Sequence, residues 1–108
     1  FDPTNSHYGI DIVAPKNEAI KATLDGTVIF AEWTVETGYV IQLQHSESLV
    51  SIYKHNSVLL KKTGEVVKAG EAIAIVGNSG ELTSGPHLHF ELWKNGVALN
   101  PLDFINFN

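Results

Sequence analysis

Residues 85–93 read Gly-Pro-His-Leu-His-Phe-Glu-Leu-Trp, and this stretch carries the clearest structural signal in the chain. Side chains alternate between the two faces of a β-strand, so residues two positions apart point the same way. The apolar side chains on one face would be Leu88, Phe90 and Leu92. The polar side chains on the other face would be His87, His89 and Glu91. The stretch therefore predicts a strand with a core face and a polar face, which is either merely solvated or functional.

Further segments have the β-branched, aromatic or alternating composition of strands, with glycine-bearing turns between them. They are residues 27–33, 39–45, 49–55, 66–77 and 97–99. A single helix is predicted over residues 57–64, because Ser57 suits a helix N-cap and Gly64 suits a helix end. Many short strands with at most one short helix predict an all-β fold of antiparallel β-hairpins.

Composition excludes several classes of protein. The chain has 108 residues, 44% hydrophobic and 18% charged, a balance typical of one soluble globular domain. Its net charge is −5, which argues against nucleic-acid binding, and no apolar run approaches the ~18 residues of a membrane span. Without cysteine, disulfides and thiolate metal sites are excluded. Because the sequence starts with Phe1 and not with an initiator Met, we expect a processed form or an excised domain. We expect residues 1–108 to be one domain, the C-terminal part of a longer chain.

Three segments carry groups suited to metal binding or acid–base chemistry: His7-x-x-x-Asp11, Tyr53-Lys54-His55 and His87-x-His89. In a fully extended strand the Cα atoms of His7 and Asp11 would lie about 13 Å apart, too far to share an ion. The first segment must therefore curve, and Gly9 permits the necessary backbone angles. In the second segment, strand alternation predicts that Tyr53 and His55 share a face.

Imidazole and carboxylate groups without sulfur suit a catalytic zinc site better than a structural one. A catalytic zinc site keeps three protein ligands and leaves the fourth position to water, so two histidines would remain for proton transfer. Other divalent ions also bind such ligand sets. The remaining histidine, His45, lies among residues typical of a surface, and we expect its role to be structural.

The three segments, with Ser84-Gly85-Pro86 before the last, together resemble the M23 family of zinc peptidases, the LytM and lysostaphin type. The order H-x-x-x-D, Y-x-H, H-x-H is a specific signal, whereas a lone H-x-H would be weak. Similarity extends over nearly the whole chain, since glycine turns near residues 26, 70 and 77–80 also resemble the family. The departures are mild: Tyr39 follows Gly38 where the family often has Asn, and Ser46 stands where Gly is common.

The resemblance implies a role for each matching residue. His7, Asp11 and His89 would hold one zinc ion, with water as the fourth ligand. His55 and His87 would move protons and stabilise the developing oxyanion, while zinc-activated water acts as the nucleophile.

The resemblance also implies a sandwich or barrel-sandwich-hybrid-like domain with an open active-site groove between β-hairpin loops. Thr83 and Ser84 precede the catalytic strand and are candidates to contact the substrate in that groove. Tyr53 is a third candidate, as a hydrogen-bond donor, although it would serve equally well as a strand aromatic.

The function implied is that of a zinc metallo-endopeptidase that hydrolyses peptide cross-links of bacterial peptidoglycan. Its partners would be the stem peptides, it would act as a monomer, and it would lie outside the cytoplasm in the cell envelope, in the periplasm or at the cell surface. D,D-cross-links and glycine bridges are both family substrates, and both stay open. The alternative is a non-catalytic cell-wall-binding or amidase-activating module of the same fold. Such relatives typically lose zinc ligands or proton-transfer histidines, and all five positions are filled here, which favours the enzyme.

Overall fold

The computed structural model describes residues 8–77 and 87–104, and within them the chain forms one antiparallel sheet of nine strands. The strands are β1 (Gly9–Val13), β2 (Ala19–Lys21), β3 (Gly26–Thr34), β4 (Gly38–Gln44), β5 (Leu49–Leu59), β6 (Val66–Val67), β7 (Ala72–Val76), β8 (His87–Lys94) and β9 (Val97–Leu99). A short 3-10 turn, η2 (Pro101–Asp103), follows β9. The all-β prediction is confirmed. In the described part of the chain, no helix is long and apolar enough to cross a membrane.

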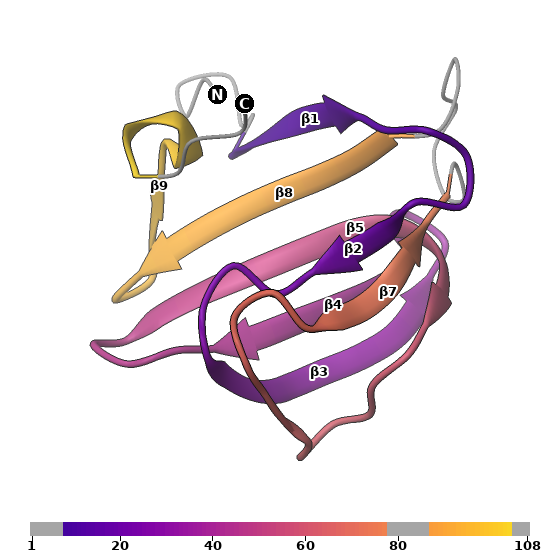
Figure 1. Cartoon of the computed structure of the whole chain (residues 1–108). Helices are drawn as coiled ribbons and strands as arrows, with labels where there is room; N and C mark the ends of the chain where they lie inside the picture. The colour runs from indigo at the N-terminus through magenta and orange to yellow at the C-terminus, as the bar shows by residue number, and fades with distance from the viewer. Residues whose placement is uncertain (1–7, 78–86, 105–108) are drawn as a thin grey trace.

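Strand β5 connects the two parts of the sheet, because it pairs with β4, β8 and β7. Its first part lies between β4 and β8, and its last residues pair with β7. The main path runs β1-β8-β5-β4-β3-β6, while β2 pairs with β7 and β9 pairs with β8. Figure 1 shows β2 and β7 lying across the curved surface of β3, β4, β5 and β8. The sheet thus folds over itself into two layers.

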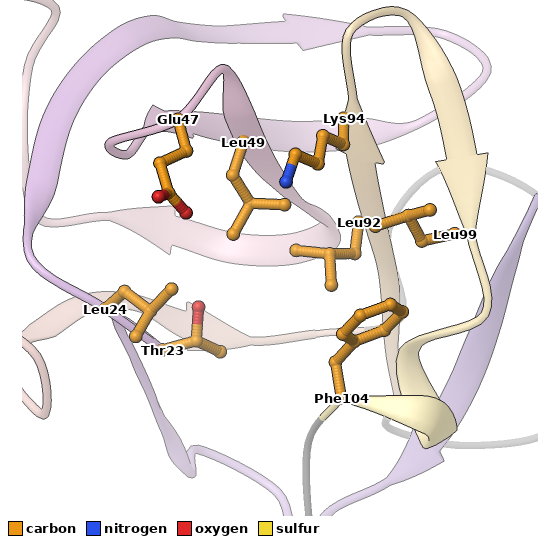
Figure 2. A pocket seen from close by; sticks show the side chains of 8 residues that line it. All are labelled: Thr23, Leu24, Glu47, Leu49, Leu92, Lys94, Leu99 and Phe104. Carbon is orange, nitrogen blue, oxygen red and sulfur yellow. The ribbon is translucent and has the colours of Figure 1, made fainter.

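A hollow of about 560 Å³ opens beside β8 and β9, and most of its lining is apolar (Figure 2). It is lined by Thr23, Leu24, Glu47, Leu49, Leu92, Lys94, Leu99 and Phe104. The charged side chains of Glu47 and Lys94 lie along one side of it. Of the predicted site residues that the structure describes, none lines this hollow.

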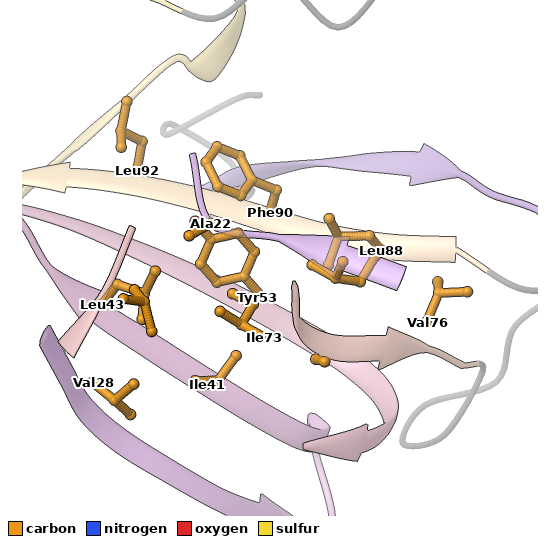
Figure 3. Packing of buried hydrophobic residues seen from close by; sticks show 13 residues of the cluster. Ala22, Val28, Ile41, Leu43, Tyr53, Ile73, Val76, Leu88, Phe90 and Leu92 are labelled. Carbon is orange, nitrogen blue, oxygen red and sulfur yellow. The ribbon is translucent and has the colours of Figure 1, made fainter. Parts of the chain in front are cut away.

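The hydrophobic core fills the space between the two layers (Figure 3). Ile20 and Ile73 enter it from β2 and β7, and Ile41 enters it from β4. The rings of Tyr53 and Phe90 pack against each other with centroids 5.3 Å apart. The predicted core face of β8 is confirmed, since its three apolar residues, Leu88, Phe90 and Leu92, are 7%, 1% and 2% exposed.

The predicted helix over residues 57–64 is wrong, because the segment pairs with β7 instead. Val58 and Leu59 are register partners of Ile75 and Ala74. Ser57 does not cap a helix, because its hydroxyl donates to the carbonyls of Ile75 and Val76. Local propensity for so short a helix is weak, so pairing with a distant strand overrides it.

His45 has the structural role expected of it, but it is buried rather than superficial, with 6% exposure. Its Nδ1 lies 2.7 Å from the carbonyl oxygen of Asp25, and its Nε2 lies 2.7 Å from Oγ of Ser51. The chain of hydrogen bonds continues from Ser51 to the Tyr53 hydroxyl at 2.9 Å and from there to Thr23. Burial raises the pKa of Tyr53 despite these bonds, which keeps the phenol neutral. This chain of hydrogen bonds therefore gives partners to polar groups inside the fold.

We predict that His45→Ala lowers the free energy of unfolding by about 2–4 kcal/mol, because it removes the ring bonded to the Asp25 carbonyl and one of the two partners of the buried Ser51 hydroxyl, and opens a cavity. Urea denaturation measures this loss, and the exposed neighbour exchange Ser46→Ala serves as the control. A His45→Ala protein as stable as the parent would show that this chain of hydrogen bonds does not stabilise the fold.

Candidate metal and catalytic site

Asp11 and His89 face each other because β1 and β8 are antiparallel neighbours. The register pairs Asp11 directly with His89, so both side chains leave the sheet on one face. Asp11 Oδ1 lies 2.9 Å from Nδ1 of His89. The carboxylate is 54% exposed and the ring only 14%, so a largely buried nitrogen meets a carboxylate open to solvent. Two of the three predicted metal ligands are therefore in contact.

The remaining members of the predicted site fall partly outside the described residues. His7, the third predicted ligand, lies there, as do the predicted substrate contacts Thr83 and Ser84. Across residues 8–77 and 87–104, no group of three His, Cys, Asp or Glu side chains is arranged to hold a metal ion by itself. The described part of the chain thus supplies two candidate ligands, Asp11 and His89.

The second nitrogen of His89 is held by Glu91, which lies two residues further along the same face of β8. His89 Nε2 lies 2.9 Å from Glu91 Oε2. Lys54 Nζ lies 2.6 Å from the same oxygen, and Trp93 Nε1 donates to Oε1 at 2.8 Å. Glu91 is only 6% exposed, so these donors compensate for the burial of its charge.

These contacts shift the pKa values of both groups. Burial by itself would raise the pKa of Glu91, but hydrogen bonds from His89, Lys54 and Trp93 outweigh burial and lower it to about 2. Burial by itself would lower the pKa of His89, but hydrogen bonds to Glu91 and Asp11 outweigh burial and raise it. The protonated ring is thus favoured between two carboxylates, and a cation that binds at Nδ1 would replace that proton.

Gly9 provides the space in which this cluster packs. A Cβ atom at Gly9 would lie 2.7 Å from Cγ of Glu91 and 2.9 Å from Nε2 of His89, and it would also meet the carbonyl oxygen of Phe90. Distances below 3.0 Å are essentially never seen for real Cβ atoms. Gly9 is the first residue of strand β1, and the absence of a side chain there is what lets the cluster pack. The predicted curve between His7 and Asp11 lies partly outside the described residues.

His55 reaches the site through an irregular backbone. Its φ is +66°, in the left-handed region that is uncommon for residues other than glycine. Its ring centroid lies 5.2 Å from that of His87 and 6.1 Å from that of His89. The prediction that Tyr53 and His55 share a face is wrong, because the left-handed residue breaks the alternation. Tyr53 enters the core, and His55 joins the other histidines.

Tyr53 itself does not reach the histidines. It is 1% exposed, its ring packs on Phe90, and its hydroxyl bonds to Ser51 and Thr23. The register explains this, because Tyr53 is paired with Phe90 on the core face of β8. Substrate contact by Tyr53 is therefore corrected to the alternative role, that of a strand aromatic.

The donor set fits a divalent metal ion. Asp11 Oδ1 and His89 Nδ1 converge, and the other nitrogen of His89 is held by a carboxylate, the arrangement usual for metal-binding histidines. The ring of His55 lies near those of both His87 and His89, with centroids 5.2 and 6.1 Å away. The sequence analysis placed Glu91 on the same strand face as His87 and His89 but gave no role in the site to Glu91, Lys54 or Trp93.

Comparison with known proteins identifies the family of this chain. The profile of "Peptidase family M23" matches residues 5–101. The chain belongs to peptidase family M23. The resemblance found in the sequence is thereby confirmed, and members of this family include peptidoglycan endopeptidases.

Two similar proteins carry different kinds of name. The chain is 40% identical over 98 residues to the murein hydrolase activator NlpD of Escherichia coli, covering 90% of this chain and 25% of that protein. It is 40% identical over 96 residues to the peptidoglycan DD-endopeptidase ShyC of Vibrio cholerae, covering 89% of this chain and 22% of that protein. A solved zinc containing peptidase from Vibrio cholerae matches with a TM-score of 0.82 and 33% identity, covering 86% of this chain and 28% of that chain. The chain thus spans about a quarter of the length of these curated relatives.

We predict that Gly9→Ala weakens zinc binding at least ~10-fold, because the added methyl group must displace Glu91 and His89 or separate β1 from β8. Competition with a fluorescent zinc chelator measures the affinity. Gly70→Ala is the matched control: its φ of +85° will cost stability, but nothing lies within 4 Å of the added Cβ and zinc affinity should stay unchanged. Equal zinc affinities for Gly9→Ala and the parent protein would show that the packing at Gly9 is not needed.

Proposed function

We propose that this domain is a zinc metallo-endopeptidase that hydrolyses peptide cross-links of bacterial peptidoglycan. The observation that carries the proposal is the convergence of four predicted site residues at one place. Asp11 contacts His89, and the rings of His55 and His87 lie next to them. Family M23 membership and the similarity to ShyC support peptidoglycan as the substrate class.

We propose His7, Asp11 and His89 as the protein ligands of a single zinc ion. Similarity to a zinc containing peptidase supports this metal, and the donor atoms Oδ1 of Asp11 and Nδ1 of His89 suit it. Zinc would supply a Lewis acid that lowers the pKa of water and polarises the scissile carbonyl. His89 would exchange its Nδ1 proton for the metal, and Asp11 would bring a compensating negative charge.

We assign proton transfer to His55 and His87. His55 is 7% exposed, and a left-handed backbone holds its ring beside that of His87. An imidazole can both accept and release a proton, so one ring would accept a proton from the nucleophile and later deliver it to the leaving amine. The other, when protonated, would donate a hydrogen bond to the developing oxyanion. Thr83 and Ser84, just before β8, remain proposed substrate contacts.

Peptidoglycan lies in the cell envelope, so an enzyme that hydrolyses it would act outside the cytoplasm.

The second candidate function is that of a cell-wall-binding or amidase-activating module. The 40% identity to NlpD, which is named a murein hydrolase activator, supports this candidate. The presence of His55, His87, Asp11 and His89 together favours the enzyme over this candidate.

The decisive experiment is a digest of purified peptidoglycan by the zinc-loaded protein, with released peptides identified by mass spectrometry. Walls with D,D-cross-links and walls with glycine bridges are used in parallel. We expect new termini at one type of peptide bond, together with at least ~100-fold lower turnover for His55→Ala at unchanged zinc content. His45→Ala, the same exchange outside the site, should keep its turnover.

Two results would contradict the proposal. Full turnover by His55→Ala would overturn the assignment of proton transfer. If the protein binds zinc but cleaves neither type of wall, the proposed endopeptidase activity is overturned. In that case, faster wall digestion by an added peptidoglycan amidase would establish the activating function.

A further inference from the structure

Glu91 is a buried charge whose interactions all lie on the polar face of β8. Glu91 is 6% exposed, and both of its carboxylate oxygens accept hydrogen bonds. Oε2 meets His89 Nε2 at 2.9 Å and Lys54 Nζ at 2.6 Å, and Oε1 accepts from Trp93 Nε1 at 2.8 Å. Three donors from two strands therefore fix the position of one acceptor group.

The direction of the hydrogen bond to His89 follows from the chemistry of the partners. An ionised carboxylate accepts and does not donate, so Nε2 of His89 must carry the proton that Glu91 receives. In a neutral ring, a proton on Nε2 leaves the lone pair on Nδ1. That nitrogen is the one 2.9 Å from Asp11 Oδ1. Glu91 thereby favours the tautomer with a free lone pair on the Asp11 side.

Asp11 and Glu91 compete for the proton of this ring, and their surroundings differ. The Asp11 side chain is 54% exposed, whereas the Glu91 side chain is 8% exposed. Water satisfies the Asp11 carboxylate in part, but the less solvated Glu91 depends on its protein donors. The geometry thus favours Glu91 as the acceptor of the proton when the ring is neutral.

The surroundings of Glu91 leave it little freedom. The backbone of Gly9 packs closely against the Glu91 side chain, since a methyl group at Gly9 would lie 2.7 Å from Cγ of Glu91. The Trp93 ring that donates to Glu91 also packs on Tyr8, with ring centroids 5.5 Å apart. Lys54 comes from β5, so the carboxylate is tied to a neighbouring strand as well.

We propose that Glu91 is a positioning residue, which fixes the orientation and tautomer of His89 and so presents Nδ1 to a metal ion beside Asp11. The inference rests on the proposed zinc site and adds to it a carboxylate behind the ligand. Lys54 and Trp93 hold that carboxylate in place. Carboxylates in this position typically change metal affinity by about 10- to 100-fold when they are removed.

The test is Glu91→Gln, because glutamine keeps the shape but has a single acceptor oxygen for three donors. We expect the zinc Kd, measured by chelator competition, to rise about 10- to 100-fold. Glu32→Gln is the matched control, since it removes the same charge from an exposed position of the same sheet, and its Kd should match that of the parent. Equal Kd values for Glu91→Gln and the parent would overturn the proposal.

A second measurement reads His89 directly and needs no metal. Nitrogen-15 NMR of the metal-free protein, at alkaline pH where the ring is neutral, should show the proton of His89 on Nε2. In Glu91→Gln it should move to Nδ1, toward Asp11. An unchanged tautomer would overturn the proposal even if zinc binding fell, because that fall would then reflect a general loss of structure.

The two proposals fail in different ways. If the parent protein does not bind zinc, the proposed zinc site is overturned, and the tautomer of His89 still decides what Glu91 does. Trp93→Phe tests the proposal independently if the Glu91→Gln protein misfolds. It removes one hydrogen-bond donor to Glu91 and keeps an aromatic ring that can pack on Tyr8. We expect a smaller, few-fold increase in Kd for this variant, and an unchanged Kd would count against the proposal.

Discussion

The pleat of β8 is the constraint on which the rest of this structure depends. One face of the strand packs Leu88, Phe90 and Leu92 into the core, so the opposite face must carry the intervening residues. A register slip of one residue would bury the histidines and expose the core side chains. Stability and chemistry are therefore specified by the same pairing, and β1 and β5 hold it from both sides.

The second constraint is the left-handed residue in β5. A positive φ at a residue other than glycine costs of order 1–3 kcal/mol and persists only where its surroundings enforce it. At His55 the backbone N–H donates to the carbonyl of Thr37 at 2.8 Å. The fully buried Asn56 then donates its amide to the carbonyls of Tyr39 and Tyr53, at 3.1 and 3.0 Å. The hairpin of β3 and β4 thereby keeps the histidine turned out of the core.

The sequence predicts the local patterns of this protein better than their long-range consequences. Alternation identified the two faces of β8, and ordered motifs identified the family, because both signals are contained in short stretches. Residues 57–59 were predicted as helix because their pairing with β7 depends on residues about 18 positions away. The roles of Gly9 and Glu91 also required the register, since only the pairing of β1, β8 and β5 brings them together with Lys54. His45 looked superficial because its partner Asp25 is 20 positions away.

The separation of Asp11 and His89 along the chain has a consequence for the order of folding. The two residues are 78 positions apart, and within the described residues β1 pairs with no strand other than β8. Contacts between such distant segments form slowly, because a long loop must close before any contact compensates for the lost entropy. Synthesis proceeds from the N-terminus, so β1 cannot pair with β8 until all the intervening strands have been synthesised. The contact between Asp11 and His89 is therefore a late product of folding, and a chain interrupted anywhere before β8 lacks it altogether.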